Sequence, residues 1–165
     1  MRIAARSYSG DKQLDDEPQN FHANGMIFDG VGIFIRGASG SGKSLLTLSL
    51  LQFASALGKQ AILVGDDRLD LYKQNQRLIM QAPDQIAGKI ELAGRGIISC
   101  EYEKTAPIDL IIDLSKTYQR MPDKSRFSAS LLDVELPACP IPDLSIIGLE
   151  HQRLLALEAI KHQKN

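Results

Sequence analysis

The chain has 165 residues, 44% of them hydrophobic and 24% charged, which predicts one globular domain over residues 1–165. Its 19 basic residues nearly balance its 20 acidic residues, which argues against a surface that binds nucleic acid. Because no signal peptide opens the chain and no apolar run reaches the roughly 18–20 residues that cross a bilayer, we expect a cytoplasmic protein that makes no membrane contact.

The start of the chain predicts short strands that lead into an apolar strand. We expect an edge strand over residues 1–10 and a polar, acidic loop over residues 11–19. Asn24-Gly25 and Asp29-Gly30 are turn signals between short apolar runs, so a hairpin should follow. This hairpin leads into an apolar strand at residues 32–35.

A glycine-rich stretch of the form G-x-x-x-x-G-K-S comes next, and we call it the phosphate loop. It consists of Gly37, Ala38, Ser39, Gly40, Ser41, Gly42, Lys43 and Ser44. Glycines let the backbone curl with its N–H groups towards a phosphate, and the following helix directs its positive dipole end at the same anion. Lys43 adds a charge near the terminal phosphates, and the Ser44 hydroxyl can hold Mg²⁺. The alternative is a simple Gly/Ser-rich turn, but the flanking strand and helix favour nucleotide or pyrophosphate binding.

The helix after the phosphate loop is predicted to run from Lys43 to about Leu57, with Gly58 as its C-terminal cap. Leucine and phenylalanine recur at helical spacing and predict its buried face. These residues are Leu46, Leu50, Phe53 and Leu57.

An acidic pair, Asp66-Asp67, ends a short apolar run at residues 60–65 that is typical of a buried parallel strand. In open α/β sheets, ligands bind beyond the carboxyl ends of the strands. A carboxylate there can hold Mg²⁺ through water or accept the proton of an attacking hydroxyl. The alternative is a turn or a helix cap, which aspartate also favours.

The middle of the chain predicts a hairpin over residues 69–81 and a short helical turn over residues 83–88. The segment 90–98 then places two glycines around Arg95, close after Glu91. Such a segment can bring N–H groups and a guanidinium to an anion, and a carboxylate to a metal. The alternative is a bulged strand with glycines at a bend.

The last third predicts a central strand, a basic loop and a closing helix. In order, we expect a strand over 107–114, a mobile loop over 116–130, a strand over 131–136, a proline-marked crossing over 137–142, a strand over 144–147 and a helix over 149–162. The basic loop is either simply solvated or able to close over phosphates. Leu154, Leu157 and Ile160 are predicted to form the buried face of the helix.

Together these motifs resemble the catalytic domain of HPr kinase/phosphorylase. The matching segments are residues 22–32, 37–44, 64–67, 91–98 and 118–121. Their order and spacing are more specific than the phosphate loop alone, and the resemblance covers about residues 20–130. The chain length is similar to that of the short, single-domain type seen in α-proteobacteria.

The resemblance implies an α/β fold, a mixed sheet with a phosphate loop and flanking helices, as in the HPr kinase C-terminal domain and PEP carboxykinase. It also implies an ATP-dependent serine kinase that acts with Mg²⁺ on HPr, a phosphocarrier protein of the sugar phosphotransferase system. In the reverse direction, phosphate would remove the group and release pyrophosphate. By the same resemblance the protein would be a homo-oligomer, namely a hexamer.

The resemblance also implies a role for each site residue. Residues 37–44 would hold the ATP phosphates, with Ser44 and Glu91 serving Mg²⁺. Asp66 would be the catalytic base, supported by Asp67. His22, which alone reads as an ordinary surface histidine, would sit near Asp66 and tune its charge. Arg120 would stabilise charge on the transferred group.

Two other functions remain open. One is a phosphate-loop kinase that acts on a small molecule. The other is a nucleotide sensor without kinase activity, which is kept because Ala93 stands where the family signature has an arginine.

Overall fold

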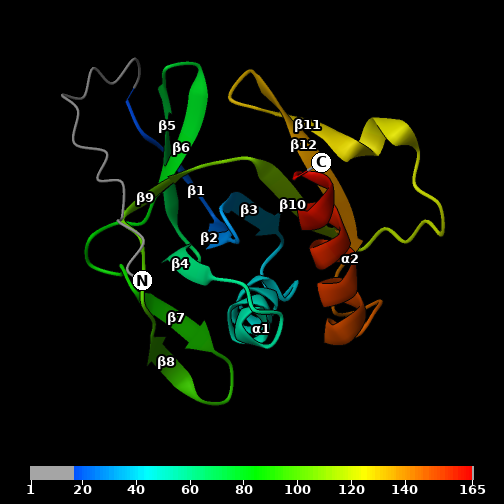
Figure 1. The fold of residues 1–165 in the computed structure, drawn as a ribbon, viewed down its shortest axis with the longest axis horizontal. Coiled ribbons are helices and arrows are strands. Elements are labelled where there is room, and N and C mark those ends of the chain that lie inside the picture. Colours follow the sequence, from blue (N-terminus) through cyan, green and yellow to red (C-terminus); the bar gives the residue numbers. More distant parts are fainter. Residues whose placement is uncertain (1–16, 165) are drawn as a thin grey trace.

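The computed structural model describes residues 17–164. The edge strand predicted over residues 1–10 and most of the loop predicted over 11–19 therefore lie outside the described residues. Two helices cover one face of a six-stranded sheet, and a four-stranded sheet lies against its other face (Figure 1). Within residues 17–164, no helix is both long and apolar enough to span a membrane.

The strands form three sheets. The six-stranded sheet has the order β11 (Ser128–Leu131), β12 (Val134–Pro142), β10 (Leu110–Ser115), β3 (Val31–Gly37), β2 (Ala23–Phe28), β4 (Ala61–Gly65). The four-stranded sheet has the order β1 (Gln19–Phe21), β5 (Leu69–Gln74), β6 (Arg77–Gln81), β9 (Thr105–Pro107). The third sheet is a hairpin of β7 (Lys89–Leu92) and β8 (Gly96–Ser99). The helices are α1 (Lys43–Ala56), α2 (Leu149–His162) and the short 3-10 helix η1 (Lys124–Phe127).

Strand directions confirm the predicted mixed sheet. β10 pairs in parallel with both β3 and β12, whereas β2 is antiparallel to both β3 and β4. The expectation that residues 60–65 form a parallel strand holds only in part, because β4 pairs antiparallel with β2 and, among the described residues, has one parallel bridge, between Leu63 and Tyr102. Because β2 is antiparallel to both β3 and β4, these two strands run in the same direction. The carboxyl ends of β3 and β4 therefore reach the same edge of the sheet.

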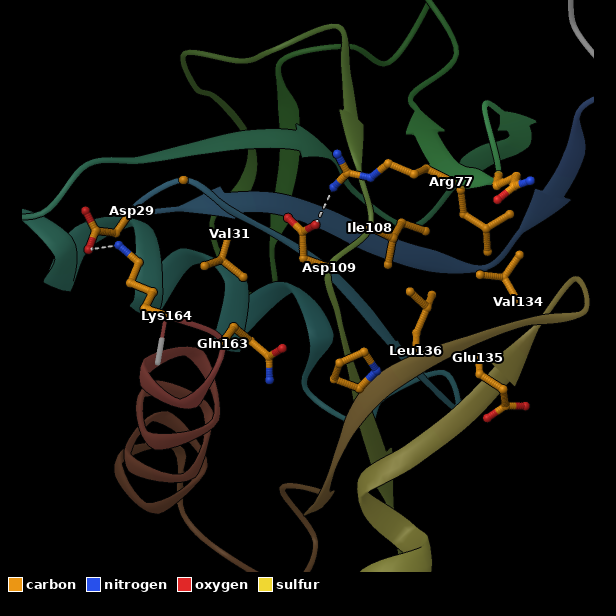
Figure 2. Close-up of a pocket in the computed structure, with 14 residues that line it drawn as sticks. Asp29, Val31, Arg77, Ile108, Asp109, Val134, Glu135, Leu136, Gln163 and Lys164 are labelled. Carbon is orange, nitrogen blue, oxygen red and sulfur yellow. Dashed lines mark hydrogen bonds and ion pairs between the residues drawn. The ribbon is translucent and has the colours of Figure 1, made fainter.

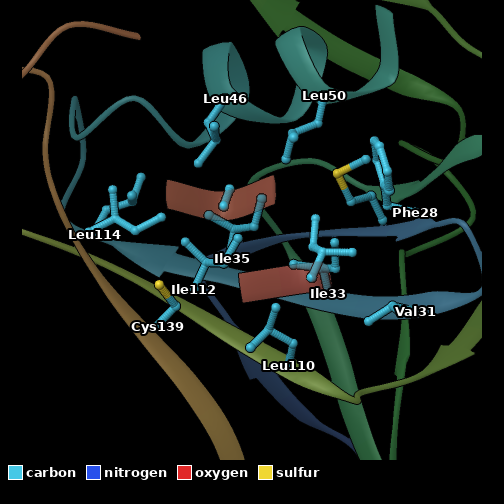
Figure 3. Close-up of a cluster of buried hydrophobic side chains, with 14 of the residues drawn as sticks. Phe28, Val31, Ile33, Ile35, Leu46, Leu50, Leu110, Ile112, Leu114 and Cys139 are labelled. Atoms are coloured by element: carbon cyan, nitrogen blue, oxygen red, sulfur yellow. The ribbon is translucent and has the colours of Figure 1, made fainter. Parts of the chain in front are cut away.

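The core separates into two layers because side chains alternate along β3. Ile33 and Ile35 face the helices, while Phe34 faces the four-stranded sheet. Leu46 and Leu50 project from α1 onto the isoleucine layer (Figure 3). This alternation holds β3 rigidly between the two layers, and β3 leads directly into the phosphate loop.

The predicted helix boundaries are close to the observed ones, but parts of the predicted faces are wrong. Leu57 is 45% exposed because α1 ends at Ala56, and Ala54 takes the buried place. On α2 the buried residues are Gln152, Ala156 and Ile160, whereas Leu154 is 66% exposed.

Several segments have a different secondary structure from the one predicted. Asn24-Gly25 lies inside β2, and the hairpin turn is Asp29-Gly30 alone. Leu132-Asp133, predicted as strand, is the turn between β11 and β12, with φ of 48° and 60°. Residues 84–88 form the predicted turn, in which Ile86 N donates to Pro83 O at 3.1 Å, whereas residues 144–147 form a turn and a bend instead of a strand.

The proline-marked crossing over residues 137–142 is in fact the second half of β12. Pro140 and Pro142 lie where β12 pairs with β10 only, after its pairing with β11 has ended. A proline at a strand edge that has no partner breaks no ladder hydrogen bond, so the strand continues through both.

Candidate functional site

The phosphate loop opens directly into the first turn of α1. The first helical hydrogen bond joins Leu46 N to Gly42 O at 2.9 Å, so the N–H groups of residues 43–45 have no helical acceptor. Gly40 and Gly42 have φ of 76° and 101°, a region that glycine adopts without strain. Free N–H groups at the positive end of a helix dipole fit a phosphate.

Lys43 is folded back onto the phosphate loop. Its side chain is buried, with the residue only 5% exposed. The ammonium donates to Gly37 O at 3.1 Å and to Ala38 O at 3.2 Å, and it lies 3.2 Å from His22 Nε2. All three donors of the ammonium are therefore engaged within the loop and by the histidine.

His22 links Lys43 to Asp67. Its Nδ1 lies 3.0 Å from Asp67 Oδ1, and its Nε2 can accept from the ammonium only if the ring proton is on Nδ1. The polar contacts of His22 thus go to Lys43 and Asp67. Burial lowers the pKa of Lys43, and the nearby carboxylates of Asp67 and Asp66 oppose that change.

Asp66 lies at the carboxyl end of β4 and is only 8% exposed. Its Oδ1 accepts from Ser44 Oγ and from Asn24 Nδ2, both at 2.7 Å. Its Oδ2 accepts from the backbone N–H of Glu91 at 2.9 Å. The sheet thereby brings the predicted base into direct contact with the serine of the phosphate loop.

Asn24 is a site residue that sequence reasoning missed. It is fully buried, and besides Asp66 its amide nitrogen donates to Thr47 Oγ1 at 3.2 Å. Its Oδ1 accepts from the Asp67 backbone N–H at 3.0 Å. The Asn-Gly pair was interpreted as a turn. The apolar residues Met26, Ile27 and Phe28, which follow this pair directly, are the signal that could have extended the strand back to Asn24.

The remaining predicted site residues are less closely placed. The Glu91 side chain is exposed, so Glu91 reaches Asp66 through its backbone only. Arg120 is exposed in the irregular segment before η1 and, in the described part of the chain, forms no hydrogen bond or ion pair.

The oxygen atoms of the site fit a magnesium ion. Among residues 17–164 there is no group of three or more His, Cys, Asp or Glu that could hold a metal. Mg²⁺ usually keeps several waters and binds through one or two protein oxygens together with substrate phosphates. The adjacent oxygens of Ser44 and Asp66 suit that kind of site.

The segment before α2 supports the phosphate loop from outside. Leu144 N donates to Ser41 O at 3.2 Å, and a Cβ added to Gly42 would approach Leu144 to 2.6 Å. Gln152 is fully buried and donates to Pro142 O at 2.9 Å. A side chain at position 42 would force the Leu144 side chain to shift and would itself be strained at a φ of 101°.

A hollow of about 670 Å³ lies at the start of β3, the end of the strand away from the phosphate loop (Figure 2). Val31, at the start of β3, lines it, whereas the phosphate loop follows the end of that strand. Four of the charged side chains that line it form pairs, Asp29 with Lys164 and Asp109 with Arg77. The convergent donors and the buried carboxylate lie instead at the phosphate loop, which is the candidate site.

Comparison with known proteins gives one consistent result. Residues 16–147 match the sequence profile described as HPr Serine kinase C-terminal domain. The HPr kinase/phosphorylase of Lactiplantibacillus plantarum is 32% identical over 141 residues, which cover 76% of this chain and 42% of that protein. The enzyme of the same name from Mycoplasma genitalium is 36% identical over 83 residues, covering 50% of this chain and 25% of that protein.

A solved structure is also similar. The structure of the Hpr(Ser) kinase/phosphatase from Coxiella burnetii superposes with a TM-score of 0.70 at 26% identity. The match covers 88% of this chain and 96% of that one. The chain spans less than half the length of the curated relatives it matches.

Proposed function

The chain belongs to the HPr serine kinase C-terminal domain family, and we propose that it transfers the γ-phosphoryl group of ATP to a serine of an HPr-like phosphocarrier protein. The observation that carries this proposal is the 2.7 Å hydrogen bond between Ser44 Oγ and Asp66 Oδ1. It puts a buried carboxylate against the loop that would hold the phosphates. Phosphoryl transfer needs positioning, charge neutralisation and one base, and the site offers candidates for each.

Asp66 would act as the base. The carrier serine attacks the γ-phosphorus, its proton passes to the Asp66 carboxylate, and a serine–phosphate bond forms. The bond from the γ-phosphorus to the bridging oxygen breaks, and its electron pair leaves with ADP. In the reverse direction, inorganic phosphate would attack the phosphorus of phosphoserine, the bond from that phosphorus to the serine oxygen would break, the serine oxygen would take a proton back from Asp66, and pyrophosphate would leave.

The other residues would prepare this step. The Lys43 ammonium would exchange its bonds to the loop carbonyls for bonds to the phosphates, while His22, which is paired with Asp67, keeps its contact with the ammonium. Mg²⁺, held by Ser44 and Glu91, would neutralise phosphate charge. Arg120 is exposed, so we propose that its segment closes over the bound nucleotide before it can stabilise the transferred group.

The test is the intact mass of the carrier. An HPr-like protein is incubated with this chain, ATP and Mg²⁺, and the expected result is one added phosphoryl group on serine. Lys43→Ala serves as the control for phosphate binding. An unmodified carrier, together with phosphoryl transfer to an added small-molecule acceptor, would instead support a small-molecule kinase, and ATP binding without turnover would support a nucleotide sensor.

A further inference from the structure

A groove lies on the outer face of α1, away from the sheet. It has a volume of about 300 Å³ and runs between α1, the β7–β8 hairpin and the start of α2. Its lining is mostly apolar: Leu45, Leu48, Phe53, Leu92 and Leu149. This volume lies at the lower end of the range of small-molecule pockets, which starts at about 300 Å³.

The groove is continuous with the phosphate loop. Leu45 lines it and directly follows Ser44 in the chain. Leu45 also carries the last N–H of the first turn without a helical acceptor, since Leu46 N already donates to Gly42 O. A polyphosphate held by these N–H groups therefore has one end next to the groove.

The chemistry of the groove suits a flat aromatic group. The Arg153 guanidinium lies 4.3 Å from the centroid of the Phe53 ring and donates to Ser49 Oγ at 2.9 Å. A planar guanidinium with one face on Phe53 leaves its other face for stacking. Arg153 is the only charged residue among those that line the described groove, so no carboxylate there opposes an anionic ligand.

We propose that this groove takes the base of the bound nucleotide, with Arg153 as a stacking and positioning residue. The inference rests on the proposed use of a nucleotide, but not on transfer to a carrier protein. It predicts that the base contributes to affinity separately from the phosphates. ATP should therefore bind more tightly than inorganic tripolyphosphate, which has no base.

The experiment fills the groove without touching the phosphate loop. Gln52 is exposed and lines the groove, and Gln52→Trp would occupy the space of the base. Ser55→Trp is the matched control, because Ser55 is exposed on the same helix and does not line the groove. The chain contains no other tryptophan, so the fluorescence of each introduced indole also reports correct folding.

Calorimetric titration with Mg²⁺ and either ATP or tripolyphosphate separates the outcomes. Gln52→Trp should weaken ATP binding by about tenfold or more and leave tripolyphosphate binding unchanged, while Ser55→Trp should change neither. Arg153→Ala should also weaken ATP binding selectively. Equal affinity of the natural chain for ATP and tripolyphosphate, or undiminished ATP binding by Gln52→Trp, would overturn the proposal that the groove binds the base. If Gln52→Trp weakens ATP binding selectively and the natural chain phosphorylates no carrier, the base site would stand and the kinase proposal would be rejected.

Discussion

Asn24 joins three parts of the site through one buried side chain. Its amide contacts the catalytic-base candidate Asp66, the helix residue Thr47 and the backbone of Asp67. An asparagine can donate twice and accept twice, and few other side chains of that size could satisfy these groups together. The position of Asp66 against the phosphate loop therefore depends on a residue of β2.

Removing this amide should be costly. Asn24→Ala leaves buried polar groups unpaired, so we expect a loss of about 1–3 kcal/mol in the free energy of unfolding. Urea denaturation measures it. Asn20→Ala is the matched control, because its amide donates to Asp70 at the exposed surface. Equal, small losses for both variants would show that Asn24 does not organise the site.

Lys43 predicts a pH dependence of phosphate binding. Burial lowers its pKa from the usual 10.5, so the charge that attracts phosphate is lost at a lower pH than in an exposed lysine. Pyrophosphate affinity should therefore fall as the pH rises from neutral towards 10.5. Lys43→Arg stays charged throughout, and it also reveals any titration of the ligand. Parallel affinity curves for the two proteins in calorimetry would contradict the prediction.

The strand β3 depends on close contact at its start. A Cβ on Gly32 would lie 1.8 Å from the carbonyl oxygen of Pro107, just before β10 pairs with β3. Gly32→Ala should therefore destabilise the protein by about 3 kcal/mol or more. Gly148→Ala meets no atom within 4 Å and should change stability by about 0.5 kcal/mol at most. Thermal unfolding compares them, and a tolerated Gly32→Ala would mean that this contact relaxes easily.

Local patterns predicted the elements that local forces determine. The limits of α1 and α2 follow from the phosphate loop, Gly58 and helical spacing, and all were found within a residue or two. The turn at Leu132-Asp133 was missed because both residues adopt a positive φ without a glycine. Residues 144–147 were missed because an apolar run resembles a strand, although Asp143 accepts from Ser145 and fixes a turn.

The site itself was only partly predictable, because it depends on which strands become neighbours. The phosphate loop motif identified Lys43 and Ser44, and the strand end identified Asp66. No pattern in the sequence indicated that β2 lies between β3 and β4. That arrangement is what directs His22 to Lys43 and Asp67, and what places Asn24 beneath the acidic pair.

The outer face of the molecule bears on assembly. Leu154 is 66% exposed on α2, and Ile146 is 46% exposed just before it. We propose that these side chains pack against a second copy, in the hexamer that the family resemblance implies. Sedimentation should give a multiple of 18.1 kDa, and Leu154→Glu should shift it towards that value. A natural chain that sediments at 18.1 kDa would rule out a stable oligomer.

Residues of β2, α1 and β7 all contact the Asp66 carboxylate beside the phosphate loop. Asp66→Asn keeps an oxygen for Ser44 and Asn24, but its NH2 group faces the Glu91 N–H, and this unpaired donor costs about 1–3 kcal/mol. The variant should therefore remain folded and bind ATP. It has, however, no base to accept the serine proton.

The deciding measurement is the single-turnover rate of phosphoryl transfer to the carrier by Asp66→Asn, compared with its ATP affinity. We expect the rate to fall by about 100-fold or more, while ATP affinity stays within a few-fold of the natural chain. A transfer rate that is unchanged at equal ATP occupancy would show that Asp66 is not the base.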